Sequence, residues 1–272
     1  MWSPPSFFVM SHAVNDHLLL ELRGVSKSFG SVQALTDVDF EVRDGEVMAL
    51  VGDNGAGKST LIKSVAGIHP FESGDVLFDG KPVQIHGPKD AARLGIEVVY
   101  QDLALCDNLD VVQNMYLGRE AHDVIFRLKE TEMERRTAET MKTLAVTTIR
   151  STRQTVATLS GGQRQSVAVA RAVMWNSRVV ILDEPTAALG VVQTRQVLEL
   201  VKRLAQQGLA VVLISHNLYD VFEVADRITV LRLGRVVGVF ETTSTNQQEI
   251  VSAITAGVAT KISGPGDAGV EA

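Results

Sequence analysis

The sequence has a single cysteine, no excess of positive charge and no apolar run long enough to cross a membrane. Cys106 stands alone in 272 residues, which excludes an internal disulfide and fits a reducing compartment. The formal net charge is −6, which argues against a general nucleic-acid surface because such a surface needs a basic stripe. No apolar run approaches the roughly 18 residues that a spanning helix needs, so any membrane span would have to come from a separate chain.

Length and hydrophobic content allow a sizeable folded core. The chain has 272 residues, of which 45% are hydrophobic, enough for one large domain or two small ones. Residues 1–17 are expected to form an N-terminal extension without a signal peptide, because no basic stretch precedes their apolar patch. Periodic sequence begins only at Leu18, so Met10 is an alternative start. Residues 259–272 have a loop-forming composition and are expected to be a disordered tail.

The most informative stretch is a strand, a glycine-rich loop and a helix in direct succession. Val47–Val51 are five apolar residues bounded by polar ones, which predicts a buried strand. The residues that follow have the pattern Gly-x-x-x-x-Gly-Lys-Ser and lead into a helix that starts near Lys58. The predicted nucleotide-binding residues of this loop are Gly52, Asp53, Asn54, Gly55, Ala56, Gly57, Lys58, Ser59 and Thr60.

This phosphate loop has a physical reason for each residue type. Glycines let the backbone curl so that several N–H groups and the positive end of the helix dipole face one small space. Lys58 would reach the β- and γ-phosphates, and Ser59 would place its hydroxyl on Mg²⁺. The alternative, a glycine-rich turn with an incidental lysine, is disfavoured by the flanking strand and helix. The sequence therefore predicts binding of a nucleoside triphosphate.

The rest of the chain predicts an α/β fold: a phosphate-loop ATPase core with a mostly parallel sheet, an antiparallel β subdomain and an inserted helical subdomain. The antiparallel strands are expected at Leu18–Val25, Val38–Val42 and Gly74–Gly80. Further buried strands are expected at Ile96–Tyr100, Arg178–Leu182 and Leu209–Ile214, followed by a hairpin around Gly234-Arg235. Helices are expected at Thr60–Ala66, Val192–Gln207 and Leu218–Ala225. The pattern from Val111 to Ala172 is mostly helical, and its charged run Arg127–Arg136 is interpreted as a solvated helix face.

Two adjacent acids end the strand predicted over Arg178–Leu182. Asp183 can hold Mg²⁺ directly or through water, and Glu184 can polarise a water for attack on the γ-phosphate. An apolar strand that ends in two acids is common for structural reasons alone. The phosphate loop upstream favours the catalytic interpretation.

A third motif, Leu159-Ser-Gly-Gly-Gln163, opens a helix expected to run to about Trp175. A serine N-cap followed by two glycines exposes backbone N–H groups suited to phosphate, although it could be only a helix cap. These residues resemble the signature of ATP-binding cassette (ABC) ATPases, and the order of phosphate loop, signature and acidic strand is that of the same family. The resemblance covers roughly residues 18–256 and implies an ABC ATPase domain over residues 18–258, with a helical subdomain at about 103–172. It assigns ATP contacts to Ser160, Gly161, Gly162 and Gln163.

The resemblance also assigns roles to side chains that would be unremarkable alone. Gln101 resembles the glutamine that senses Mg²⁺ and connects to the membrane partner, and His216 resembles the histidine that contacts the γ-phosphate. Phe29 resembles the aromatic residue that stacks on adenine, although it could equally be core. The catalytic set is then Glu184, His216 and Gln101, and the metal set is Ser59, Gln101 and Asp183. Gly190 departs from the family pattern, which has an aspartate there, and this puts the cross-dimer contact of that acid in doubt.

In the family, ATP lies between the phosphate loop of one subunit and the signature of another. The resemblance therefore implies ATP and Mg²⁺ as cofactors, and a homodimer or a dimer with a homologous ATPase. The partners that it implies are integral membrane permease subunits and, indirectly through them, a sugar-binding protein, with no nucleic acid. The implied location is the cytoplasmic face of the cell membrane, where the chain would be bound peripherally. The segment Gly74–Glu120 resembles the ATPases of bacterial simple-sugar importers of the ribose, xylose and fructose group.

Two alternatives remain open from the sequence. One is a motor for an exporter or for another imported solute, which the identity of the membrane partner would separate. The other is a soluble ABC protein that acts in translation or DNA repair. Translation-type members carry two cassettes in one chain and repair-type members insert long coiled coils, and neither feature is present here. The expected function is thus the ATP-hydrolysing motor of a sugar importer.

Overall fold

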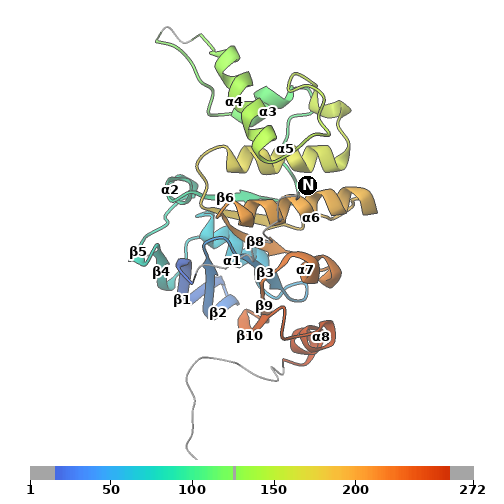
Figure 1. Cartoon of the computed structure of the whole chain (residues 1–272). Helices are drawn as coiled ribbons and strands as arrows, with labels where there is room; N and C mark the ends of the chain where they lie inside the picture. Colours follow the sequence, from blue (N-terminus) through green and yellow to red (C-terminus); the bar gives the residue numbers. More distant parts are fainter. Residues whose placement is uncertain (1–15, 125–126, 258–272) are drawn as a thin grey trace, which may run out of the picture.

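A six-stranded sheet in the order β10-β9-β3-β8-β7-β6 forms the centre of the molecule (Figure 1). The computed structural model describes residues 16–124 and 127–257. All neighbouring strands of this sheet run parallel except β10, which forms an antiparallel hairpin with β9. The strands are β3 (Val47–Val51), β6 (Ile96–Val99), β7 (Val179–Asp183), β8 (Ala210–Ile214), β9 (Arg227–Arg232) and β10 (Arg235–Glu241).

Both faces of the central sheet are buried, as the continuous apolar runs of its strands predict. Along β3, Met48 and Leu50 pack into one hydrophobic cluster, and Ala49 and Val51 pack into a second cluster on the other face. Helices that contribute to these clusters include α1 (Lys58–Val65), α5 (Gly161–Val173), α6 (Val191–Gln206), α7 (Leu218–Val224) and α8 (Gln247–Ala256). The fold class predicted from the sequence is confirmed.

A four-stranded antiparallel sheet in the order β2-β1-β4-β5 lies against the phosphate-loop side of the core. Its strands are β1 (Leu18–Phe29), β2 (Val32–Arg43), β4 (Ser73–Phe78) and β5 (Lys81–Pro82). Arg227 joins the two sheets, because its buried guanidinium donates to Glu46 and to Glu41 of β2. This joint ties the end of β2 to the starts of β3 and β9, at the opposite end of these strands from the phosphate loop.

A helical lobe is inserted between β6 and β7 and stands above α6 in Figure 1. It consists of α3 (Val111–Tyr116), α4 (Glu130–Thr143), the short 3-10 helix Val156–Thr158 and α5. The sequence correctly predicted that helices are the regular elements of this block, but long non-helical connections separate them. The charged run reaches α4 only from Glu130 onward, and α5 ends at Val173 instead of about Trp175.

Three elements of the structure are missing from the sequence prediction: β5, α2 (Pro88–Arg93) and α8. Two helix-start signals could have revealed the helices: Pro88 at the first position of α2, and Asn246 followed three residues later by Glu249 at the start of α8.

Of the predicted N-terminal extension, only residues 16 and 17 are described; Met10 and the predicted disordered tail lie outside the described residues. Within residues 16–124 and 127–257, no helix is long and apolar enough to cross a bilayer.

Candidate nucleotide-binding site

The predicted functional residues converge on one edge of the central sheet. The phosphate loop follows β3, and His216 follows β8. Asp183 ends β7, Glu184 comes directly after it, and Gln101 follows β6. Because β3, β8, β7 and β6 are parallel neighbours in that order, their carboxyl ends meet at this edge. Ligand sites of open parallel sheets form at this edge.

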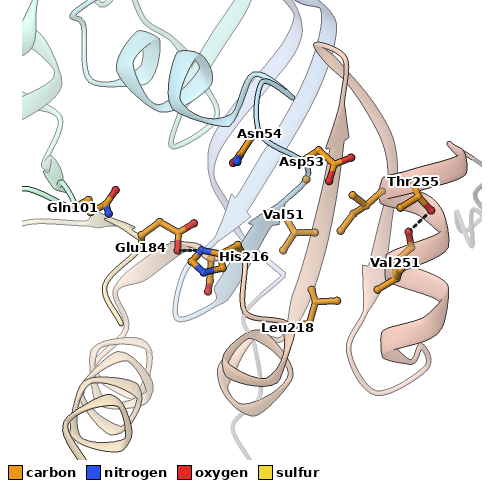
Figure 2. A pocket seen from close by; sticks show the side chains of 12 residues that line it. Val51, Asp53, Asn54, Gln101, Glu184, His216, Leu218, Val251 and Thr255 are labelled. Carbon is orange, nitrogen blue, oxygen red and sulfur yellow. Dashed lines mark hydrogen bonds and ion pairs between the residues drawn. The ribbon is translucent and has the colours of Figure 1, made fainter. Parts of the chain in front are cut away.

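Two cavities open along this edge and share Asn54, Gln101 and Glu184. The first, about 360 Å³, is lined by most of the phosphate loop together with Asp183 and the start of β2. The second, about 610 Å³, holds His216 and is closed on its far side by Leu218 of α7 and by Val251, Ile254 and Thr255 of α8 (Figure 2). The lining residues of α8 were missed by the sequence interpretation because α8 was not predicted, whereas Leu218 lies in the predicted helix Leu218–Ala225 but was not assigned to the site.

The phosphate loop is shaped by tight contact with the antiparallel sheet. Gly57 caps α1 with a left-handed φ of 106°, and a Cβ there would lie 2.8 Å from the backbone oxygen of Ala34 in β2. Only glycine tolerates both the dihedral and the contact. Gly55 also has a left-handed φ, of 81°, but a Cβ there would meet no atom within 4 Å. The loop therefore needs glycine at position 55 for its backbone conformation alone. At position 57 it needs glycine both for the backbone conformation and for packing against β2.

Lys58 lies across the loop that precedes it. Its ammonium Nζ donates to the carbonyl oxygens of Gly52 (2.6 Å) and Asp53 (3.0 Å). Burial lowers the pKa of Lys58, and the nearby carboxylates, Glu184 first among them, oppose that shift. An ammonium has three donor hydrogens, so one remains to bind a phosphate oxygen.

Asp183 and Glu184 have different surroundings although they are adjacent. Burial, followed by the charge of Glu184, raises the pKa of Asp183, while Lys58 and Lys63 counteract part of that rise. Glu184 has a left-handed backbone φ of 50°, held by its N–H donating to the carbonyl of Ile214 at 3.0 Å. A non-glycine residue in this region is strained, and such strain clusters at active sites.

Glu184 contacts His216 directly, as Figure 2 shows. The imidazole Nδ1 lies 2.7 Å from the carboxylate Oε2, with the histidine largely exposed and the glutamate side chain 17% exposed. Gln101 lies on the other side of Glu184 in the same view. The carboxylate is thus flanked by two polar side chains at the mouth of both cavities.

The donor set beside the phosphate loop suits a hard cation. Ser59, Gln101 and Asp183 supply a hydroxyl, an amide oxygen and a carboxylate to the same 360 Å³ cavity. No group of three or more His, Cys, Asp or Glu side chains with metal-binding geometry occurs among the described residues. An arrangement with few protein ligands fits Mg²⁺, which keeps several waters and is held by one or two carboxylates together with substrate phosphates.

The signature residues do not reach this site within one chain. Ser160 caps α5 in a reciprocal box, because its side chain accepts from the N–H of Gln163 and its own N–H donates to Oε1 of Gln163. Ser160 and Gln163 line a separate cavity of about 470 Å³ with Gly190 and the first turn of α6. Gly161 and Gly162 allow close packing, since a Cβ would lie 3.0 Å from Leu189 and 3.1 Å from Gln193.

Phe29 lies at the end of β1 and is 43% exposed. Its ring packs edge-on against His69 with centroids 5.2 Å apart, and Lys27 Nζ lies 5.5 Å from its centroid. It is not among the residues that line the phosphate-loop cavity, which takes Val32, Gln33 and Ala34 from the next strand instead. An adenine contact by Phe29 stays a prediction.

The sequence resembles known proteins along most of its length. The pattern of the family described as "ABC transporter" matches residues 35–187. The chain is 49% identical over 239 residues to the xylose/arabinose import ATP-binding protein XylG of Sulfolobus acidocaldarius, covering 87% of this chain and 94% of that protein. It is 49% identical over 223 residues to the fructose import ATP-binding protein FrcA of Rhizobium meliloti, covering 80% and 86%. It is 42% identical over 237 residues to the ribose import ATP-binding protein RbsA of Yersinia pestis, covering 86% of this chain and 45% of that one.

Solved structures agree with the fold. A nucleotide-free ATP-binding cassette from an ABC transporter superposes with a TM-score of 0.75 at 22% identity, covering 88% of this chain and 95% of that one. The bacterial ABC transporter cassette MJ0796, solved as a dimer, superposes with a TM-score of 0.70 at 25% identity, covering 82% and 99%. With a family pattern over residues 35–187 and relatives nearly half identical in sequence, this chain belongs to the ABC transporter family.

Proposed function

We propose that this chain is the ATP-hydrolysing motor subunit of an ABC importer for a simple sugar. One observation carries the proposal: Lys58, the Asp183-Glu184 pair, His216 and Gln101 meet at one sheet edge, while the signature Ser160 lines a cavity of its own. The site is thus divided into two halves that a single chain does not join.

In the proposed site, the phosphate loop and Lys58 bind the β- and γ-phosphates of ATP, and Ser59, Gln101 and Asp183 hold Mg²⁺. When bound, Mg²⁺ neutralises phosphate charge and orients the γ-phosphate. Burial and the neighbouring Glu184 raise the pKa of Asp183, so a cation held there would favour its ionised form.

Glu184 acts as the general base in this proposal. Its carboxylate accepts a proton from the water that attacks the γ-phosphate, and the left-handed backbone directs it differently from its neighbour Asp183. His216, 2.7 Å from Glu184, orients that carboxylate and lies where it can reach the γ-phosphate. Positioning and charge stabilisation supply most of the catalysis of phosphoryl transfer.

The proposed active form is a dimer in which the phosphate loop of one copy faces the signature of the other. Ser160 caps α5 and, with Gly161 and Gly162, opens that helix, so the signature can bring backbone N–H groups and the positive end of the helix to the γ-phosphate. The dimeric MJ0796 cassette is the same fold assembled in pairs. Closure of the dimer would complete each site and expel water from it.

The proposed cargo is a simple sugar, because three relatives carry xylose/arabinose, fructose and ribose import in their names. The membrane path is assigned to separate permease subunits, with this chain bound peripherally at the cytoplasmic face and a sugar-binding protein on the far side. Nucleic acid is not proposed as a partner. A motor for another imported solute is the second candidate, since no described residue is assigned a contact with the cargo.

The test is reconstitution of the chain with its permease in lipid vesicles. We expect slow phosphate release by the chain alone and faster release with the permease, its binding protein and one of xylose, arabinose, fructose or ribose. The Glu184→Gln variant of the same complex is the matched control and should lose the stimulated activity. Turnover that does not change on adding the permease would contradict the motor role, and stimulation only by a solute of another class would contradict the sugar.

A further inference from the structure

The side chain of Gln163 joins the signature to a distant part of the helical lobe. Its Oε1 accepts the N–H of Ser160 at 2.9 Å, which completes the cap of α5. Its Nε2 donates to the backbone carbonyl oxygen of Thr148 at 2.6 Å. Thr148 lines the same 470 Å³ cavity as Ser160 and Gln163 and belongs to segment 144–148, which follows α4. The orientation of the Gln163 amide therefore depends on where this segment lies.

Segment 144–148 begins in a strained turn. The N–H of Ala145 donates to the carbonyl oxygen of Lys142 at 2.9 Å. The N–H of Val146 donates to the carbonyl oxygen of Met141 at 2.9 Å, so α4 ends in a Schellman motif. Its left-handed residue is Ala145, with a φ of 51°, at a position that glycine usually takes. Such strain persists only where the surrounding structure fixes the backbone.

Helix α6 supplies the groups that fix this turn. Arg203 Nη1 donates to the carbonyl oxygens of Leu144 (2.9 Å) and Ala145 (3.4 Å). Gln207, just after α6, donates its Nε2 to the carbonyl oxygen of Thr143 at 3.1 Å. Carbonyls at the C-terminal end of a helix have no helical N–H to accept, and the helix dipole favours a cation there. Arg203 thus meets both the hydrogen-bonding and the charge requirement of the end of α4.

Helix α6 lies between the helical lobe and the central sheet (Figure 1), where it packs on α5 and on strands β3 and β8. A cavity of about 150 Å³ lies between α6 and segment 144–148, so close packing does not hold the segment at that point. The hydrogen bonds of Arg203 and Gln207 cross this boundary instead. A series of contacts therefore leads from the core through Arg203, the segment and Gln163 to Ser160.

We infer that Arg203 is a positioning residue for the signature, acting on Ser160 through segment 144–148 and the amide of Gln163. The inference rests on the proposed function, in which Ser160 closes over ATP held by a second copy. Arg203 lines none of the cavities that hold the two halves of the site. Without its guanidinium, the acceptor of Gln163 would no longer be fixed and the cap at Ser160 would loosen. ATP binding at the phosphate loop does not involve these contacts.

Arg203→Ala in the Glu184→Gln background tests the role. The ATP-bound dimer should dissociate about three- to tenfold more readily, a size typical of coupling within one hydrogen-bond network. ATP affinity, titrated at protein concentrations too low for the dimer, should stay unchanged. Arg203→Lys keeps a cationic donor and should restore the dimer constant. Lys202→Ala is the matched control, because it removes the neighbouring cation of α6, which pairs with Glu223 at 3.5 Å, and it should change neither constant.

A double-mutant cycle shows whether Arg203 acts through Gln163. Gln163→Ala alone should weaken the dimer, and adding Arg203→Ala should cause little further loss because the series of contacts is already broken. Gln207→Ala changes an exposed side chain, so it provides a second variant if Arg203→Ala does not fold. It should shift the dimer constant in the same direction by a smaller factor.

Each result decides between the alternatives. An Arg203→Ala variant that melts at a lower temperature but keeps the dimer constant would overturn the inference and assign the residue to stability alone. Losses from Arg203→Ala and Gln163→Ala that simply add would overturn the route through Gln163. Both results would leave the proposed function intact. Absence of any ATP-dependent dimer in the Glu184→Gln parent would overturn the proposed function and this inference with it.

Discussion

Alanine at Gly57 should destabilise this protein much more than alanine at Gly55, although both glycines lie in the phosphate loop. Both have left-handed backbone conformations, φ 106° and 81°. An L-residue in such a conformation costs roughly 1–2 kcal/mol, and both variants bear that term. The surroundings differ, since a Cβ at Gly57 would meet the Ala34 oxygen at 2.8 Å and Leu35 Cδ2 at 2.9 Å, whereas one at Gly55 meets nothing.

The contact at Gly57 adds an overpacking cost of about 1–3 kcal/mol, because a backbone oxygen cannot move aside as a flexible side chain can. The total is about 2–5 kcal/mol for Gly57→Ala against about 1–2 kcal/mol for Gly55→Ala. For a chain of this size each kcal/mol lowers the melting temperature by about 2–4 °C, so we expect losses of roughly 4–20 °C and 2–8 °C.

Calorimetry of both variants without nucleotide, at one pH and scan rate, measures the difference. ATP titration of the same samples separates folding from binding, because Gly55 lines the phosphate-loop cavity and its new methyl should hinder ATP more than it hinders folding. Equal melting temperatures for the two variants would refute the view that contact with β2 shapes this loop.

Three further predictions concern charged side chains. Lys58→Ala removes the ammonium beside the phosphates and should weaken ATP binding as well as turnover; near-normal affinity in a titration would show that Lys58 does not contact the phosphates. Asp183→Asn should raise the melting temperature of the nucleotide-free protein at pH 7.5 while weakening Mg-ATP binding. The reason is that burial and Glu184 raise the pKa of Asp183, so folding stability falls as pH rises from the ordinary aspartate pKa through the raised one; an unchanged pH profile of stability in the variant would contradict this. Arg227→Leu leaves the fully buried Glu46 carboxylate without its cationic partner and should cost about 3–5 kcal/mol in urea unfolding. A loss under about 1 kcal/mol would argue against the joint between the sheets.

The core and the phosphate loop could be predicted because local pattern and tertiary role agree there. Val47–Val51 is apolar at every position and is buried at every position, and its predicted bounds are those of β3. Asp183 and Glu184 could be placed near the loop because parallel strands end at a common edge. Alternation along three segments predicted an antiparallel sheet, whereas the pairing of β1 with both β2 and β4 became visible only in the structure.

The sequence was less informative where structure depends on packing between distant segments. Helix α8 carries only weak apolar periodicity, and it closes the 610 Å³ cavity because Ile250 and Ala253 pack into the core. The contact of Glu184 with His216 joins residues from two different strand ends, so no local pattern reports it. The same holds for Gly57, whose need for glycine is set by Ala34 on another strand.

The divided site is tested most directly by the oligomeric state of Glu184→Gln. This variant keeps the size of the side chain but removes the basic carboxylate, a loss that typically slows reactions roughly 10²–10⁴-fold. Mg-ATP should still bind through Lys58 and Asp183, and Ser160 of a second copy should close over it, so gel filtration should show a dimer with ATP and a monomer with ADP. Adding Ser160→Arg should abolish the dimer by placing bulk and charge against the γ-phosphate. A Glu184→Gln variant that stays monomeric with ATP, or keeps most of its ATPase activity, would contradict a site built from two copies with Glu184 as its base.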